Sequence, residues 1–186
     1  MRGYFAFLIV FAAFALLISL VELNLNSKSH NLSAAIVTEK FYRVQMNVKE
    51  VLIEAARQGA VEGFGEYTAT HNTAICVQNP NHPNCFKKDE AAAAAELQAM
   101  IRIQDAITAD FDDDIDITVF LGTTPLTAKV VPDPSVLPNH FRLSSIELAK
   151  TSPISMTMTS EKDPEFTQDV SMPKIMVYVD ERTSYS

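Results

Sequence analysis

The sequence has few of the residues from which recognisable catalytic motifs are built. Only five glycines are present, and they form no glycine-rich loop of the kind that cradles phosphate groups. The four histidines have no nucleophile motif such as G-x-S-x-G beside them; they are His30, His71, His82 and His140. We therefore expect no enzyme activity, no catalytic residue and no cofactor, with a site assembled only by folding as the alternative.

Positive charge is also scarce. Fifteen lysines and arginines stand against 23 aspartates and glutamates, so the formal net charge is −8. Nucleic acids and anionic membrane surfaces are bound by basic patches, which argues against a nucleic-acid partner and against a body that lies flat on a membrane. The acidic balance chiefly favours solubility of the exposed part of the chain.

One long apolar run is present, the 18 uncharged residues from Tyr4 to Val21, preceded by Arg2 and Gly3. About 20 such residues, each rising ~1.5 Å along a helix, span the hydrocarbon core of a bilayer. We predict a leader and transmembrane helix within residues 1–23, with the bilayer contacted through residues 4–23. A cleaved secretory signal is the alternative, but its apolar core is shorter and ends in an A-x-A-like site.

The basic residues around this run indicate its orientation. Arg2 precedes the run, and the first basic residue after it is Lys28. Because lysine and arginine accumulate on the cytoplasmic side, we expect a single-pass cell-membrane protein with a cytoplasmic N-terminus and an extracytoplasmic body.

A second feature is a proline-free stretch from Leu23 to Ala69. Its apolar residues recur at steps of three and four, which predicts an amphipathic extension of the helix over residues 24–70. They are Leu32, Ala35, Ile36, Phe41, Val44, Val48, Val51, Leu52, Ala55, Gly59 and Gly63. Gly59, Gly63 and Gly65 fit either a close helix contact or the end of the helix, and we favour the end.

The only two cysteines, Cys76 and Cys85, flank a turn-rich loop that contains Pro80 and Pro83. In an oxidising compartment this spacing favours a disulfide. With His71 and His82 the cysteines also form H-x4-C-x5-H-x2-C, so zinc binding is one alternative and reduced thiols are another. The spacing matches no common zinc finger, and we predict a disulfide and no metal site.

The remaining sequence, residues 71–186, predicts an α+β head. Acidic residues followed by an alanine run predict a second helix over about Asp89–Ala109, with a core stripe at Leu97, Met100, Ile101 and Ile103. Alternating apolar residues predict strands at 115–121, 143–148, 154–159 and 174–179. Four or five half-exposed strands suggest one antiparallel sheet packed on one face by helix.

Two further motifs have structural and functional interpretations. The aspartates of Asp110–Asp116 could bind calcium, but Ile115 and Leu121 occupy the positions that an EF-hand gives to glycine and glutamate. A solvated turn is the preferred interpretation. Asn31-Leu32-Ser33 matches the N-glycosylation pattern, which also arises by chance.

The basic-glycine leader, the apolar helix that continues as an amphipathic rod, and the β-rich head with a small cysteine loop resemble type IV pilin-like proteins. Leu20-Val21-Glu22-Leu23 and Ala55–Ala60 are also similar to TadE-type minor pilins. The resemblance implies cleavage after Gly3, which would leave Tyr4 as the first residue, and assembly with other pilin-like subunits or assembly-machinery proteins. Leu8 stands where many pilins carry glutamate, which fits a minor subunit better than a major one.

The function implied is a membrane-anchored subunit or accessory component of a surface filament or secretion assembly, with release into a filament as one possible fate. The strongest alternative is an anchored extracytoplasmic protein whose head senses or binds a ligand, or has a purely structural role in the envelope.

Overall fold

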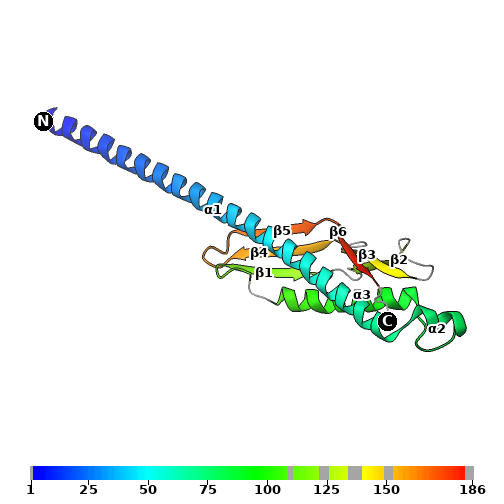
Figure 1. Ribbon diagram of the computed structural model, residues 1–186. Helices are drawn as coiled ribbons and strands as arrows, with labels where there is room; N and C mark the ends of the chain where they lie inside the picture. The colour runs from blue at the N-terminus through cyan, green and yellow to red at the C-terminus, as the bar shows by residue number, and fades with distance from the viewer. Residues whose placement is uncertain (1, 109–110, 122–125, 134–139, 149–152, 183–186) are drawn as a thin grey trace. The chain divides into compact units, whose positions relative to one another are not determined.

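The computed structural model describes residues 2–108, 111–121, 126–133, 140–148 and 153–182 of the chain. Within the first helix, the side chains of residues 2–15, 26, 27 and 29–31 lie outside this description. Three helices are followed by six strands in the described residues, so the α+β class is confirmed (Figure 1). The chain divides into two compact units, Met1–Arg43 and Val44–Ser186, and the boundary falls inside the first helix.

The first helix, α1, runs from Arg2 to Thr70 and confirms the predicted long helix. In the Val44–Ser186 unit its buried apolar side chains recur at every fourth residue: Val44, Val48, Leu52, Ala56, Ala60 and Phe64. Since a turn holds 3.6 residues, a step of four advances by about 40°, and the buried stripe winds slowly around the helix. The predicted face is therefore only partly correct, because Leu32 and Ile36 are more than half exposed.

Two shorter helices follow, α2 (Thr73–Gln78) and α3 (Lys88–Ile107). α3 confirms the predicted second helix, and Asp89 and Glu90 lie in its first turn, where the helix dipole favours acidic residues. Its predicted core stripe is largely wrong. Ile103 is buried, but Leu97 is 65% exposed and Ile101 is 42% exposed.

The buried stripe of α3 is instead made mainly of alanine, at Ala91, Ala95 and Ala99. Beside this stripe, the backbones of α1 and α3 approach closely where α1 carries glycine. A Cβ atom added at Gly59 would lie 2.5 Å from the carbonyl oxygen of Gln98, and one added at Gly63 would lie 2.4 Å from that of Ala94. The prediction that the glycines mark the end of the helix is therefore wrong: Gly59 and Gly63 mark a close helix contact.

The two helices are antiparallel: Gly59 of α1 lies against Gln98 of α3, and Gly63, one turn later in α1, lies against Ala94, one turn earlier in α3. An ion pair between Glu62 and Arg102 also joins them, with a guanidinium nitrogen 2.8 Å from a carboxylate oxygen. The disulfide loop and α2 connect the end of α1 to the start of α3.

Six strands form two antiparallel three-stranded sheets. The first sheet has the order β1-β4-β5 and contains β1 (Ile115–Phe120), β4 (Ile154–Ser160) and β5 (Thr167–Met172). The second has the order β2-β3-β6 and contains β2 (Leu126–Pro132), β3 (Phe141–Leu148) and β6 (Ile175–Arg182). The four predicted strands are confirmed as β1, β3, β4 and β6. The prediction of a single sheet is wrong, and β2 and β5 were not predicted.

The registers explain why one sheet becomes two. β3 pairs with β6 as far as Leu148 opposite Ile175, and β4 pairs with β5 from Ile154 opposite Met172. The segment that contains β3 and β4 therefore pairs twice with the segment that contains β5 and β6, and a short gap separates the two paired regions. Pro153 and Pro173 lie at this level, and a proline cannot donate a hydrogen bond to a strand ladder.

α3 covers the second sheet, where it contacts β2 and β3. Alternate residues of β2 point toward the core, as Leu126, Ala128 and Val130 do. The backbone N–H of Ala128 donates to a carboxylate oxygen of Glu96 at 2.8 Å, so α3 also occupies part of the edge of β2. On β6 the outward residues Met176 and Tyr178 are exposed.

Candidate functional site

The most elaborately constructed feature of the Val44–Ser186 unit is the loop that follows α1. Cys76 in α2 and Cys85 form a disulfide with a Cα–Cα distance of 4.8 Å, which confirms the predicted pairing. Both sulfurs are therefore bonded to each other, and the zinc alternative loses its two thiolate ligands. Closure of the loop fixes α2 against the chain segment that leads into α3.

Hydrogen bonds reinforce this closure. The side-chain oxygen of Asn72 accepts from the N–H of Ala74 at 2.7 Å and caps the start of α2. The backbone N–H of Asn72 donates to the carbonyl oxygen of Asn84 at 3.0 Å, and that of Cys85 donates to His82 at 2.9 Å. Asparagine and proline in the loop supply the turn conformations that these bonds require. The loop is therefore held by both covalent and hydrogen bonds.

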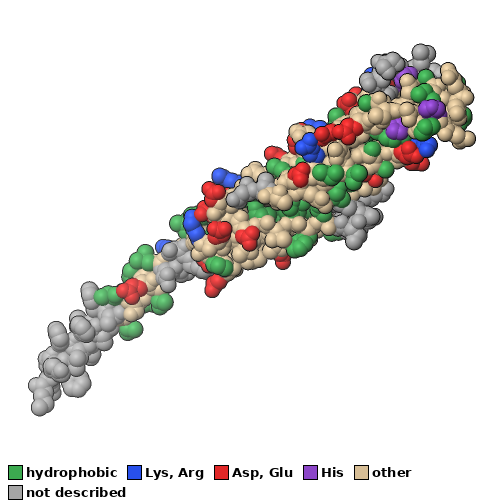
Figure 2. All heavy atoms as spheres, turned by 90° about the horizontal axis from the view of Figure 1, so that it is seen from below, with side chains coloured by type: hydrophobic (Ala, Val, Ile, Leu, Met, Phe, Trp, Pro, Cys, Tyr) green, Lys and Arg blue, Asp and Glu red, His purple; other side chains and the backbone are tan. Residues whose placement is uncertain are grey.

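Four aromatic rings from three parts of the chain meet beside the loop, in the order His71, Tyr67, Phe86 and Phe141. His71 stacks on Tyr67 with 4.0 Å between ring centroids, and Tyr67 meets Phe86 edge to face at 5.7 Å. Phe86 stacks on Phe141 at 4.8 Å with 20° between the ring planes. We call these four residues the aromatic ladder. Figure 2 shows histidine side chains gathered, beside apolar ones, at the end of the unit where the ladder lies.

An apolar pocket of about 270 Å³ opens beside the ladder. Its lining comes from α2 and from the two phenylalanines of the ladder, and consists of Thr73, Cys76, Val77, Phe86 and Phe141. None of the five carries a charge, and the Thr73 hydroxyl is the one side-chain hydrogen-bonding group of ordinary strength among them. No pattern in the sequence predicted this pocket, because its walls come from segments that only the fold brings together.

The other flank of the ladder is polar. The Tyr67 hydroxyl donates to Glu90 at 3.1 Å, and the Lys87 ammonium donates to the same carboxylate at 2.8 Å. The hydrogen bond from Lys87, together with the one from Tyr67, holds the pKa of Glu90 below its usual value. Burial raises the pKa of Tyr67, so this hydroxyl stays protonated and serves as a donor rather than as a base. The cluster positions the start of α3.

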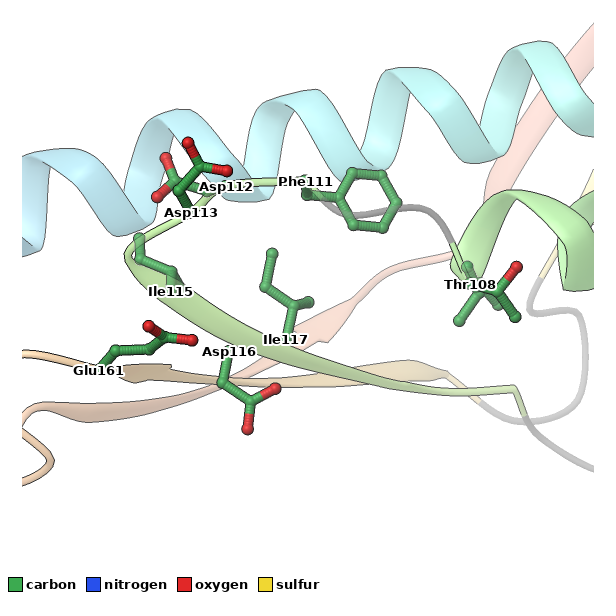
Figure 3. Close-up of a pocket in the computed structure, with 9 residues that line it drawn as sticks. Thr108, Phe111, Asp112, Asp113, Ile115, Asp116, Ile117 and Glu161 are labelled. Carbon is green, nitrogen blue, oxygen red and sulfur yellow. The ribbon is translucent and has the colours of Figure 1, made fainter.

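A second, acidic pocket of about 350 Å³ lies where the chain enters β1 (Figure 3). Asp112, Asp113, Asp116 and Glu161 are among its lining residues. Figure 3 shows the side chains of Asp112 and Asp113 lying together, while that of Asp116 points away from them. Among the residues that the structure describes, no group of three or more histidine, cysteine, aspartate or glutamate side chains is placed to hold a metal ion.

Local bonds define this acidic segment as a turn. A side-chain oxygen of Asp112 accepts from the N–H of Asp114 at 2.9 Å, and the Lys162 ammonium pairs with Asp114 at 2.6 Å. The first aspartate of the predicted calcium motif, Asp110, lies outside the described residues.

The predicted processing site lies in a part of α1 whose side chains are outside the description. Gly3 and Tyr4 belong to the helical backbone, and cleavage between them stays a prediction. The side chain of Asn31 is likewise not described. Within the described part of the chain, we find no helix with the length and apolar character needed to cross a membrane. Most side chains of the run Tyr4–Val21 fall outside that part.

Comparison with known proteins gives no relative from which a function could be transferred. No family model, curated protein or solved structure matches the chain. The resemblance to pilin-like proteins therefore stays a hypothesis that rests on the sequence pattern.

Proposed function

We propose that the chain is a membrane-anchored, extracytoplasmic subunit that assembles through its N-terminal helix, as pilin-like minor subunits do, and that the α+β unit is its exposed head. The bilayer and neighbouring pilin-like helices would be the partners of α1. The proposal assigns no reaction to any residue.

The observation that carries the proposal is the exposed apolar surface of α1. Every residue from Leu16 to Leu25 is exposed, and most of them are large and apolar. Leu16, Leu17 and Ile18 are consecutive, so they lie about 100° apart and face different sides of the helix. A helix that is apolar on all sides is stable when lipid or other protein surrounds it. The run Tyr4–Val21 extends this character toward the N-terminus.

Further along α1, the exposed apolar side chains are fewer and are mixed with polar ones. Leu32 and Ile36, four residues apart, are 64% and 58% exposed. Residues with this spacing share one helix face, and burial of two such side chains is favourable by about 1.5–3 kcal/mol each. We infer that this face packs against the equivalent helix of a neighbouring subunit.

The disulfide is consistent with an extracytoplasmic head. Cys76 and Cys85 are paired, and such bonds persist mainly in oxidising compartments. The head also carries the whole acidic excess of the chain, since residues 1–43 have four basic and two acidic residues, and this favours an exposed, soluble surface.

Site-specific photo-crosslinking in native membranes tests the assembly. The photoreactive residue p-benzoylphenylalanine is placed at Leu32 or Ile36, and at the exposed Thr38 as the matched control, which lies more than about 100° away from both around the same helix. We expect adducts between subunits at positions 32 and 36, several-fold stronger than at position 38. Equal or absent adducts at the three positions would contradict assembly through this face.

The anchor is tested in the same membranes by extraction with alkaline carbonate, which releases proteins that are only peripherally bound. We expect the protein to stay with the lipid; release into the supernatant would refute the anchor.

N-terminal sequencing of the protein recovered from these membranes tests processing separately. A chain that starts at Tyr4 is expected. A chain that retains residues before Tyr4 would exclude cleavage after Gly3 and favour a static anchor.

A further inference from the structure

We propose that the apolar pocket beside the disulfide is a binding site for one uncharged aromatic ring, which would stack on the ladder as an additional member. The ring could belong to a small aromatic molecule or to an aromatic side chain of a partner protein. The inference is independent of the proposed function, because it concerns only the head.

The size and lining of the pocket indicate this class of ligand. The volume of about 270 Å³ lies just below the range of ~300–1,000 Å³ that is typical of drug-sized ligands, so it suits a small group. Its five lining residues include no acidic or basic side chain that could neutralise a charged ligand. An ionised group would lose part of its hydration there without gaining a charged partner, which favours uncharged ligands. An uncharged, mostly apolar group is therefore the best match.

The ladder makes an aromatic group the best fit among apolar ones. Phe86 and Phe141 already stack at 4.8 Å, and both contribute to the wall of the pocket. Aromatic pairs gain energy beyond the burial of their area when their rings are offset-stacked or edge to face. A further ring in the pocket would make such contacts, whereas an aliphatic group of similar size would gain only from burial.

Part of the pocket wall is also fixed in place before any ligand binds. One lining residue, Cys76, is covalently tied to Cys85, and Phe86 is only 6% exposed. The backbone N–H of Phe86 donates to the carbonyl oxygen of Asn72 at 3.4 Å, which holds the phenylalanine against the start of α2. A preformed site avoids part of the entropic cost of binding.

Methyl NMR spectroscopy on the full chain in lipid nanodiscs tests the inference. Thr73 and Val77 each carry methyl groups that line the pocket, and indole is the probe. We expect saturable shifts of both methyl signals with a Kd of about 1 mM, as the efficiency limits for a ligand of this size suggest. Shifts are analysed against the concentration of dissolved indole, because lipid takes up part of it. Cyclohexanol, a non-aromatic probe of similar size, should bind at least fivefold more weakly.

Three variants provide the controls. Thr73→Phe fills the pocket from its own wall and should weaken indole binding more than tenfold. Val77→Ala removes part of the rim, should weaken binding about twofold to fivefold, and serves if Thr73→Phe does not fold. Phe120→Ala removes an exposed ring on β1 outside the pocket and should leave binding unchanged.

N-acetyl-tryptophanamide distinguishes the two sources of the ring. Binding as tight as that of indole indicates a protein side chain, and binding more than tenfold weaker indicates a small molecule. The inference is overturned if indole causes no saturable shift of the two methyl signals. It is also overturned if cyclohexanol binds equally well, or if the Thr73→Phe variant binds indole as the parent does.

Discussion

Substitution of the glycines in α1 tests the most consequential packing contact of the fold. An alanine Cβ at position 59 would lie 2.5 Å from the carbonyl oxygen of Gln98 and 2.6 Å from the Cα atom of Ala99. Both neighbours are backbone atoms of α3 and cannot rotate away. Ordinary contact distances begin near 3.5 Å, so α1 and α3 must separate by about 1 Å at this point. We therefore expect Gly59→Ala to destabilise the protein.

The matched control is Gly65→Ala, in the same helix. A Cβ atom at position 65 has no atom within 4 Å, so this variant gains the higher helix propensity of alanine without a clash. That gain is about 1 kcal/mol, and Gly59→Ala has it as well. The difference between the two variants therefore isolates the cost of overpacking, about 1–3 kcal/mol.

Thermal unfolding of the full chain in mild detergent, followed by near-ultraviolet circular dichroism, provides the measurement. We expect Gly65→Ala to melt slightly above the parent and Gly59→Ala below it. For a chain of this size a difference of 1 kcal/mol shifts the midpoint by about 2–4 °C. Equal midpoints for the two alanine variants would refute the close contact between the backbones of α1 and α3.

Three further predictions concern the head. Replacement of Cys76 and Cys85 by serine should destabilise the head by about 2.5 kcal/mol, as expected for a loop of this length, and should lower the denaturant midpoint; an unchanged midpoint would contradict a structural disulfide. The pKa of Glu90 is lower in the folded state than its usual value of 4.5, so the ionised carboxylate stabilises the folded state at pH values above 4.5. This stability is lost as the pH falls through the folded-state pKa. Glu90→Gln should therefore flatten the dependence of the melting temperature on pH between about pH 5 and pH 2, and a profile parallel to that of the parent would argue against the interaction. Ile103→Ala should cost about 2–5 kcal/mol whereas Leu97→Ala should cost less than about 0.5 kcal/mol, and equal losses in chemical denaturation would contradict the assignment of buried and exposed faces on α3.

The elements that the sequence predicted well are those with strong local signals. The absence of proline allowed α1 to be predicted, and an alanine run with acidic residues before it allowed α3 to be predicted. Alternating apolar residues identified β1, β3, β4 and β6. β5 was not predicted because its sequence, Thr167–Met172, is mostly polar and exposed, so the alternation of apolar residues is weak.

The burial of α3 was predicted incorrectly for a different reason. A hydrophobicity pattern assigns the largest apolar side chains, such as Leu97 and Ile101, to the core. Here α1 approaches the backbone of α3 closely at Gly59 and Gly63, and the buried positions of α3 are three alanines and Ile103. The identity of the packing partner decides which face is buried, and that information is not local.

In the candidate site, too, one feature could be predicted from the sequence and another could not. Two cysteines with a turn-rich spacer were enough to predict the disulfide, because a short loop with turn residues brings its own ends together. The pocket beside it needed the fold, since its lining residues Cys76, Phe86 and Phe141 come from α2, the exit of the loop and the start of β3. The sequence by itself determined the two long helices, most strands and the cysteine pair, which depend on neighbouring residues. Only the tertiary structure decided the helix contact and the aromatic pocket, because contacts between distant segments depend on the packing of the whole head.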